Sequence, residues 1–238
     1  MEEIGKALKV IFDKLSDFFD IFDLSFFVSG VFSTGIVYGW ITFRGFDQSS
    51  SLSSLPVIVV ILICYIAGLT SFAVGRWLRT GVIGFIKKKY IRFRYKDFAF
   101  DRFFIKILKA HGLDQDSTIK DYLERSLYRG TWRLYVRLWA EVRATSDLTQ
   151  SLSFLKRYWV MAATYDGLTF SFLLGILLII EIQIDAGRTL SEGIPYFFGI
   201  ISFFFIILII CLREANRFLE YQVEELVATV AAYRAKTK

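Results

Sequence analysis

The stretch GIPYFFGIISFFFIILIICL, residues 193–212, contains no Asp, Glu, Lys or Arg. A helix rises about 1.5 Å per residue, so about 20 mostly apolar residues cross the hydrocarbon core of a bilayer. Three further stretches meet this criterion: Leu24–Phe43 and Gln48–Gly75 carry no charge, and Tyr158–Ile180 is interrupted by Asp166 alone. A soluble chain of 238 residues has room for one such buried helix but not for four. The sequence therefore predicts an integral membrane protein with four transmembrane helices.

Basic residues concentrate between the second and the third of these segments. Residues 76–157 contain 19 of the 29 Lys and Arg residues against eight Asp and Glu, a local net charge of +11. The other two connections, Arg44–Ser54 and Glu181–Glu192, are short and contain one Arg each. Basic loops stay on the cytoplasmic side of a membrane. We therefore expect two transmembrane hairpins, with the basic block and both termini in the cytosol.

The segments outside the hairpins complete an all-α organisation, because no strand-like alternation of apolar and polar residues persists in the sequence. A break at His111–Asp114 precedes a helix that Ser117 or Thr118 can cap and that should run to about Ala144. A further helix should run unbroken from about Asp147 to Ile180. The predicted domains are an amphipathic helix at the membrane interface or against the cytosolic domain (1–23), a transmembrane hairpin (24–75), a basic cytosolic helical domain (76–157), a second transmembrane hairpin (158–212) and a cytosolic C-terminal helix (213–238).

Small residues recur every four positions in three of the transmembrane segments. Such stripes allow helix backbones to approach closely, which is how membrane helices associate. They predict either packing inside one four-helix bundle or contacts between subunits around a pore. The residues assigned to helix packing are Gly35, Gly39, Ala67, Ser71, Gly75, Ala163, Gly167, Ser171 and Gly175.

Asp166 lies within the third apolar segment, seven residues past Trp159 and so about 10 Å deeper along a helix. A carboxylate at such a depth costs a few kcal/mol unless it is paired, protonated or hydrated, which makes a functional role its first interpretation. It could line an aqueous path, pair with a residue such as Arg76, or act as a satisfied polar group near the cytoplasmic edge. We group Asp166 with Ser29 and Ser33 as candidate polar residues of a pore.

Basic residues form two further patterns. Six of them lie within ten residues just after the second segment and alternate with aromatic residues, which is typical of a site for anionic lipid headgroups, at about 1 kcal/mol per residue. Lipid headgroups account for this charge, so nucleic acid is not expected as a partner. Four arginines at intervals of four predict a stripe on one helix, either a solvated, salt-bridged face or a site for an anionic ligand or partner protein. The lipid cluster is Lys87, Lys88, Lys89, Arg92, Arg94 and Lys96, and the arginine stripe is Arg125, Arg129, Arg133 and Arg137.

Motifs of the common catalytic classes do not occur in the sequence. It contains one histidine, His111, and no GxSxG, P-loop, HExxH or CxxC pattern, so we predict no catalytic residue, metal or cofactor. We expect a non-enzymatic homo-oligomer that forms an ion-conducting pore or perturbs the membrane under control of its cytosolic domain. The alternatives are a membrane-embedded sensor or scaffold that recruits a cytosolic protein, and a small transporter.

The layout of the whole chain resembles that of small bacterial four-span proteins of unknown function, some of which are encoded beside phage-defence genes. The likeness is one of topology, with two apolar hairpins on either side of a basic block. It implies a location in the bacterial inner membrane and a role in antiviral defence.

Overall fold

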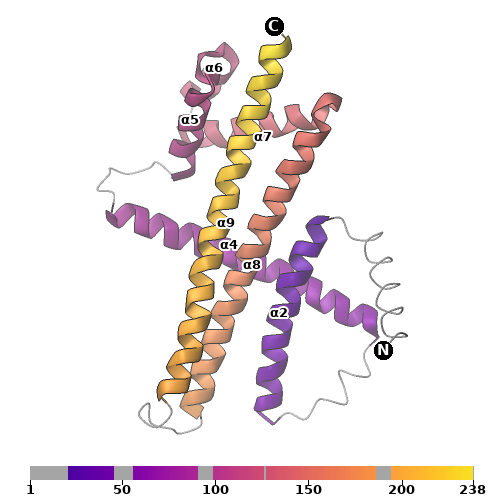
Figure 1. The fold of residues 1–238 in the computed structure, drawn as a ribbon, viewed down its shortest axis with the longest axis vertical. Helices are drawn as coiled ribbons and strands as arrows, with labels where there is room; N and C mark the ends of the chain where they lie inside the picture. The colour runs from indigo at the N-terminus through magenta and orange to yellow at the C-terminus, as the bar shows by residue number, and fades with distance from the viewer. Residues whose placement is uncertain (1–20, 46–55, 91–98, 126, 186–193, 238) are drawn as a thin grey trace. The chain divides into compact units, whose positions relative to one another are not determined.

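The computed structural model describes residues 21–45, 56–90, 99–125, 127–185 and 194–237, and every element within these ranges is helical. The predicted all-α fold is confirmed. Four helices are long and apolar enough to cross a membrane. The predicted helix at 1–23 lies outside the described residues apart from its last three. The elements are α2 (Ile21–Phe43), α4 (Val57–Tyr90), α5 (Ala99–Ala110), η1 (Leu113–Gln115), α6 (Ser117–Arg125), α7 (Leu127–Ala144), η2 (Ser146–Leu148), α8 (Thr149–Asp185) and α9 (Ile194–Thr237) (Figure 1).

Helices α8 and α9 are both unbroken, with 37 and 44 residues. The continuous helix predicted from Asp147 to Ile180 is therefore confirmed, and the C-terminal segment continues the fourth apolar segment without interruption. The two prolines of the chain do not interrupt a helix. Pro195 is the second residue of α9, and Pro56 precedes α4 and accepts its first hydrogen bond, from the Val59 N–H at 2.9 Å. A missing N–H costs nothing at these positions.

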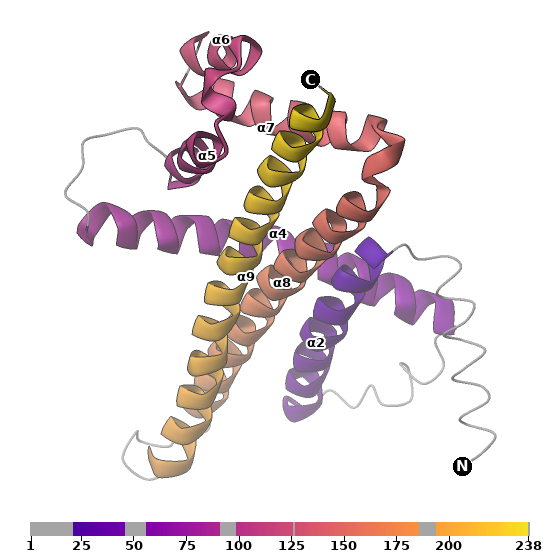
Figure 2. The same ribbon diagram turned by 45° about the horizontal axis from the view of Figure 1, so that its top comes forward.

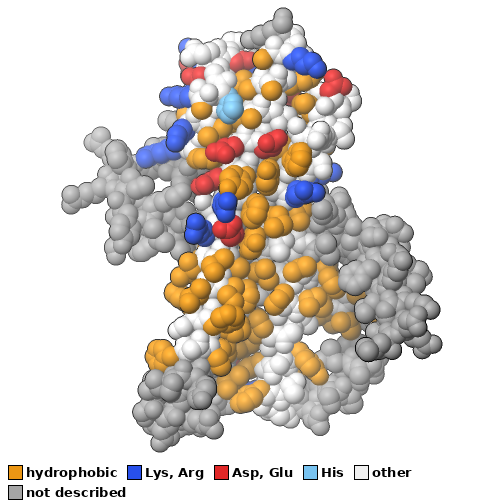
Figure 3. All heavy atoms as spheres, viewed as in Figure 1, with side chains coloured by type: hydrophobic (Ala, Val, Ile, Leu, Met, Phe, Trp, Pro, Cys, Tyr) orange, Lys and Arg blue, Asp and Glu red, His pale blue; other side chains and the backbone are white. Residues whose placement is uncertain are grey.

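The chain divides into two compact units. The apolar unit comprises residues 1–78 and 163–215, and the charged unit comprises residues 79–162 and 216–238. Helices α4, α8 and α9 each contribute one part to each unit. Hydrophobic side chains dominate the face of the apolar unit in Figure 3, whereas Lys, Arg, Asp and Glu side chains are frequent on the charged unit.

Aromatic rings fill the apolar unit, in which α4 crosses α2 and α8 (Figures 1 and 2). The ring of Phe26, on α2, lies 5.2 Å from that of Phe72, on α4. The ring of Phe172, on α8, lies 6.2 Å from Phe32 of α2 and 5.6 Å from Phe204 of α9. Each of the four apolar helices therefore contributes to one packed unit.

The charged unit has a hydrophobic core of its own. Helices α5, α7 and α9 each bury apolar residues at intervals of three or four, the pattern of a helix with one face in a core. Burying one large apolar side chain contributes about 1.5–3 kcal/mol, so this core accounts for the compactness of the unit. Its fully or nearly fully buried members include Phe104, Leu108, Ile119, Leu134, Leu138, Val142, Leu155, Val223, Leu226, Val227 and Val230.

The break predicted at His111–Asp114 is confirmed. Helix α5 ends at Ala110, and Gly112 follows with a φ of +67°, a left-handed conformation that side chains disfavour. The residue that caps α6 is Asp116 and not the predicted Ser117 or Thr118. Its Oδ1 accepts a hydrogen bond from the Thr118 N–H at 2.9 Å.

The single helix predicted from Ser117 to Ala144 is wrong, because residues 15 apart in one straight helix are about 22 Å apart, yet Arg137 of α7 donates to the Tyr122 hydroxyl of α6 at 2.9 Å. Arg125 therefore lies on a different helix from the other three arginines of the predicted stripe. The physical reason is core formation. Ile119 of α6 and Leu134 of α7 both belong to the buried cluster of the charged unit.

Arg234, near the end of α9, joins three elements of the charged unit. Its Nε and Nη2 donate to the Glu141 carboxylate at 2.9 and 2.6 Å, and its Nη1 donates to Asp116 at 2.8 Å. The hydrogen bonds that Arg234 donates to Glu141 raise the pKa of Arg234, which stays charged at all ordinary pH values. Burial alone would raise the pKa of Asp116, but the Thr118 N–H and the Arg234 charge outweigh it and lower that pKa.

We expect acid to destabilise the charged unit through Asp116. Because its pKa is lower in the folded than in the unfolded chain, its contribution is complete above the unfolded value of about 4 and is lost as the pH falls through the folded pKa. The measurement is the unfolding midpoint in detergent between about pH 6 and about pH 2. Asp116→Asn, which keeps a capping side chain, should lose less stability than the parent chain over this range, while Asp114→Asn should behave like the parent. An equal loss in both variants would contradict this role of Asp116.

Candidate functional site

Three hydroxyl groups from three helices meet inside the apolar unit. Ser33 Oγ of α2 lies 2.7 Å from Ser71 Oγ of α4 and 2.8 Å from Ser171 Oγ of α8. The Ser171 hydroxyl also lies 3.2 Å from the Ser29 carbonyl oxygen. Ser33, Ser71 and Ser171, which we call the serine cluster, are at most 5% exposed. Interhelical hydrogen bonds of this kind contribute about 1 kcal/mol each in a membrane.

Glycines on both sides of this cluster allow the helix backbones to touch. A Cβ atom on Gly30 would overlap the Cys64 carbonyl group. A Cβ on Gly68 would overlap the Phe26 carbonyl group. These two contacts between α2 and α4 are as close as backbones allow, and no side chain fits between them.

Gly30 and Gly68 were missed by the sequence analysis, which followed the stripes at intervals of four. A signal was nevertheless present. Glycine costs about 1 kcal/mol relative to alanine inside a helix. A glycine in an apolar segment therefore indicates a close contact even where no stripe passes through it.

Most of the residues assigned to helix packing lie at such contacts. A Cβ on Gly75 would overlap the Asp166 carbonyl group, and one on Gly167 would lie 2.5 Å from the Ser29 side chain. A Cβ on Gly175 would lie 2.9 Å from the Phe204 ring. Ala163 is 2% exposed. Ser71 and Ser171 belong to the serine cluster, and the Ala67 carbonyl accepts a hydrogen bond from the Ser71 hydroxyl at 2.7 Å.

Gly35 and Gly39 are different. Both are exposed on α2, and a Cβ at either position would meet no other atom within 4 Å. The spacing Gly35-x-x-x-Gly39 is therefore not used for packing between the described residues of one chain.

The three candidate pore residues are buried within the protomer, where Ser29, Ser33 and Asp166 are 0%, 5% and 1% exposed. The Ser29 hydroxyl donates to the Phe26 carbonyl oxygen at 3.1 Å, and Ser33 belongs to the serine cluster. Arg76 places its guanidinium group 6.0 Å from the Phe72 ring, and its pairing with Asp166 stays a prediction. Among the described residues of a single protomer, the side chains of Ser29, Ser33 and Asp166 are therefore buried and do not face an open surface.

The predicted basic sites are only partly covered by the described residues. Lys87, Lys88 and Lys89 lie in α4, and Arg92, Arg94 and Lys96 lie outside the described residues. Arg125 is the last residue of α6, and Arg129 lies near the start of α7. Arg133 and Arg137 are exposed on α7, and Arg137 donates to the Tyr122 hydroxyl at 2.9 Å.

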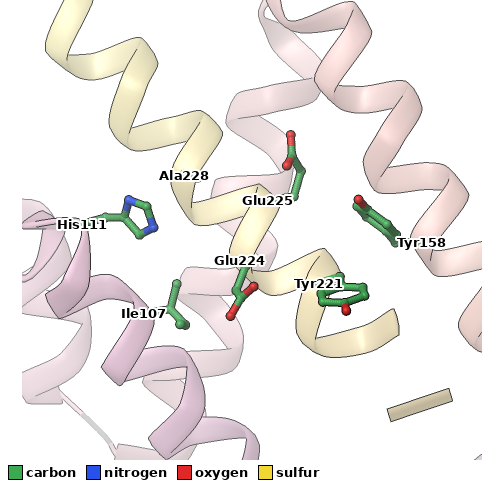
Figure 4. A pocket seen from close by; sticks show the side chains of 7 residues that line it. All are labelled: Ile107, His111, Tyr158, Tyr221, Glu224, Glu225 and Ala228. Carbon is green, nitrogen blue, oxygen red and sulfur yellow. The ribbon is translucent and has the colours of Figure 1, made fainter. Parts of the chain in front are cut away.

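A second site, which the sequence analysis missed, is a cleft of about 320 Å³ in the charged unit (Figure 4). Two carboxylates, one imidazole and two phenol rings line it together with two apolar side chains. No local motif connects these groups, because they come from the end of α5, the first part of α8 and the last part of α9. The lining residues are Ile107, His111, Tyr158, Tyr221, Glu224, Glu225 and Ala228.

Among the residues that the structure describes, no three His, Cys, Asp or Glu side chains are grouped so that they could hold a metal ion. The candidate sites therefore consist of the glycine and serine contacts of the apolar unit and the cleft of the charged unit. Comparisons with protein-family models, with curated proteins and with solved structures find no match to this chain.

Proposed function

We propose that this chain is a non-enzymatic integral membrane protein that assembles into homo-oligomers and, once assembled, conducts ions or perturbs the membrane. In this proposal the charged unit lies in the cytosol and controls the assembly, and the basic residues at 87–96 contact anionic headgroups of a bacterial inner membrane. Four apolar helices support a membrane location. An ion pair between Arg44, just after α2, and Glu181 of α8 supports two hairpins, because it requires the first and third spans to run in the same direction.

The observation that carries the proposal is the open face of α2. Glycine is costly in a helix, and Gly30 and Gly68 offset this cost through close contacts. Gly35 and Gly39 make no such contact with the residues that the structure describes. The glycine pair lies among exposed apolar side chains, including Val31 and Tyr38. A Gly-x-x-x-Gly face of this kind fits closely against the same face of another helix. We therefore assign this face to contact with a second copy of the chain.

A path for ions would then run between copies. Inside the protomer, Ser33 and Asp166 are buried, and Ser33 is hydrogen-bonded to Ser71 of α4 and to Ser171 of α8. Four helices in one chain rarely enclose a water-filled path. Assembly is therefore a condition for conduction in this proposal.

We expect Gly35→Leu/Gly39→Leu to abolish assembly while leaving the protomer folded, because both new side chains enter open space. The parent protein should elute as an oligomer in light-scattering chromatography in mild detergent and should release a trapped ion from liposomes. The double variant should elute as a monomer and should retain the ion. Val37→Leu, an exposed apolar exchange on the same helix, is the matched control. If the double variant keeps the parent mass, assembly does not use this face.

A second candidate function is a membrane-embedded scaffold that recruits a cytosolic protein and acts in antiviral defence. It is favoured by Trp132 and Val136, which are 53% and 49% exposed on α7 beside the exposed Arg133 and Arg137. An aromatic and arginine-rich surface is typical of protein interfaces. If the full chain conducts nothing and binds one stoichiometric protein that Trp132→Ala/Val136→Ser fails to bind, the scaffold function holds and the pore is excluded.

A further inference from the structure

The cleft of the charged unit contains carboxylates without a basic partner. Glu224 is exposed, and no described side chain forms a hydrogen bond or an ion pair with it. Glu225 accepts one weak hydrogen bond, from the Thr229 hydroxyl at 3.4 Å. These two consecutive residues bring two negative charges to the cleft, against one positive charge from Arg217, which contacts the lining residue Tyr221.

Aromatic rings stand next to these carboxylates. The rings of Tyr158 and Tyr221 have their centroids 6.0 Å apart. Arg217 holds the Tyr221 side chain in place. The Arg217 Nε donates to the Tyr221 phenol oxygen at 2.7 Å, and the Arg217 guanidinium group lies 5.2 Å from the Tyr221 ring centroid. The negative faces of phenol rings attract cations, and this attraction adds to that of a nearby carboxylate.

The cleft is held in shape by the core beneath it. Its walls come from α5, α8 and α9, and each of these helices buries a leucine in the same hydrophobic cluster: Leu108, Leu155 and Leu226. A volume of about 320 Å³ is at the lower end of the range for small-molecule sites. It suits one charged group with a short apolar stem, and Ile107 and Ala228 supply apolar surface for such a stem.

We propose that this cleft binds an organic cation through an ammonium or guanidinium group. The carboxylates of Glu224 and Glu225, which leave α9 in different directions (Figure 4), attract the cation by their charge, and the Tyr158 and Tyr221 rings contact its charged end and its stem. The group can belong to a free amine or to a basic side chain of a peptide. The proposal does not depend on oligomerisation or conduction, because every lining residue belongs to the charged unit of one chain.

The test uses the single histidine of the chain as a reporter in the cleft. Full-length protein in detergent, labelled with ¹³C in histidine alone, gives one imidazole Cε1–H signal. Titration with cadaverine, a small molecule whose amino groups are protonated at neutral pH, should shift this signal in a saturable way. An Ala-Lys-Ala tripeptide with blocked termini is the second titrant. The titrant with the lower dissociation constant shows whether the cation is a small amine or a peptide side chain.

The double variant Glu224→Gln/Glu225→Gln should bind about tenfold more weakly, because it removes both charges and keeps the side-chain shapes. Glu124→Gln, an exposed carboxylate on α6, should bind like the parent. Sodium chloride at matched ionic strength should give no saturable shift. The proposal fails if neither titrant saturates the signal, or if the double variant follows the parent curve. A normal unfolding midpoint of the double variant shows that any loss of binding is not a loss of folding.

Discussion

Replacing Gly68 with valine should separate α2 from α4 and should cause a large loss of stability in the apolar unit. A Cβ at Gly68 would occupy the space of the Phe26 carbonyl group, which is backbone and cannot rotate away. The helices must therefore move apart, which disrupts the Phe26–Phe72 contact and the Ser33–Ser71 hydrogen bond. We expect a cost of about 3 kcal/mol or more. Gly30→Val should have the same effect, because it meets the Cys64 carbonyl group from the other helix.

The two cysteines make this loss measurable. Cys64 and Cys211 are 6% and 3% exposed, and both belong to the apolar unit. A thiol-reactive fluorescent dye therefore reports when this unit opens during heating in detergent. Gly39→Val introduces the same side chain on α2 in open space and should leave the midpoint within a few degrees of the parent. If Gly68→Val and Gly39→Val lower the midpoint equally, the crossing of α2 and α4 at Gly68 does not occur.

Phe104→Ala should cause the second large loss, in the charged unit. The Phe104 side chain is completely buried in α5, and its ring lies edge-on to that of Tyr135 with centroids 6.1 Å apart. Truncating such a ring removes its apolar contacts and leaves a cavity, at a cost of about 3–5 kcal/mol. Trp132→Ala is the matched control, because Trp132 also stacks on Tyr135, at 5.4 Å, but is 53% exposed. It should cost less than about 1 kcal/mol.

Hydrogen exchange of the backbone amides resolves where the Phe104→Ala loss occurs. Protection should fall in α5 and α7 and in the last part of α9, which share the core of the charged unit. Phe104→Ala should change the temperature at which the cysteines react less than Gly68→Val does, since both cysteines lie in the apolar unit. A core role for Phe104 is excluded if the exchange rates of Phe104→Ala and Trp132→Ala match.

The sequence determined the helical class and the four long apolar helices, because a bilayer admits only segments whose backbone groups are satisfied internally. This constraint acts on each segment separately, so hydropathy alone predicts the four helices. The continuous α8 and α9 were predictable for a related reason, since Pro195 lies in the first turn of α9 and α8 contains no proline. The break between α6 and α7 was not predictable in this way. It depends on Ile119 reaching a core that other helices build.

Only the tertiary structure decided how equivalent residues are used. Gly39 and Gly68 both lie in apolar helices, yet a Cβ on Gly68 would overlap a carbonyl group, whereas a Cβ on Gly39 would meet no atom of the described residues within 4 Å. Similarly, His111 and Glu224 are far apart in the sequence and line one cleft. Helical periodicity specifies which residues share a face of one helix, but the partner of that face depends on packing energies summed over several helices. For this reason the sequence by itself determined the helices, whereas their contacts and the cleft emerged only from the folded chain.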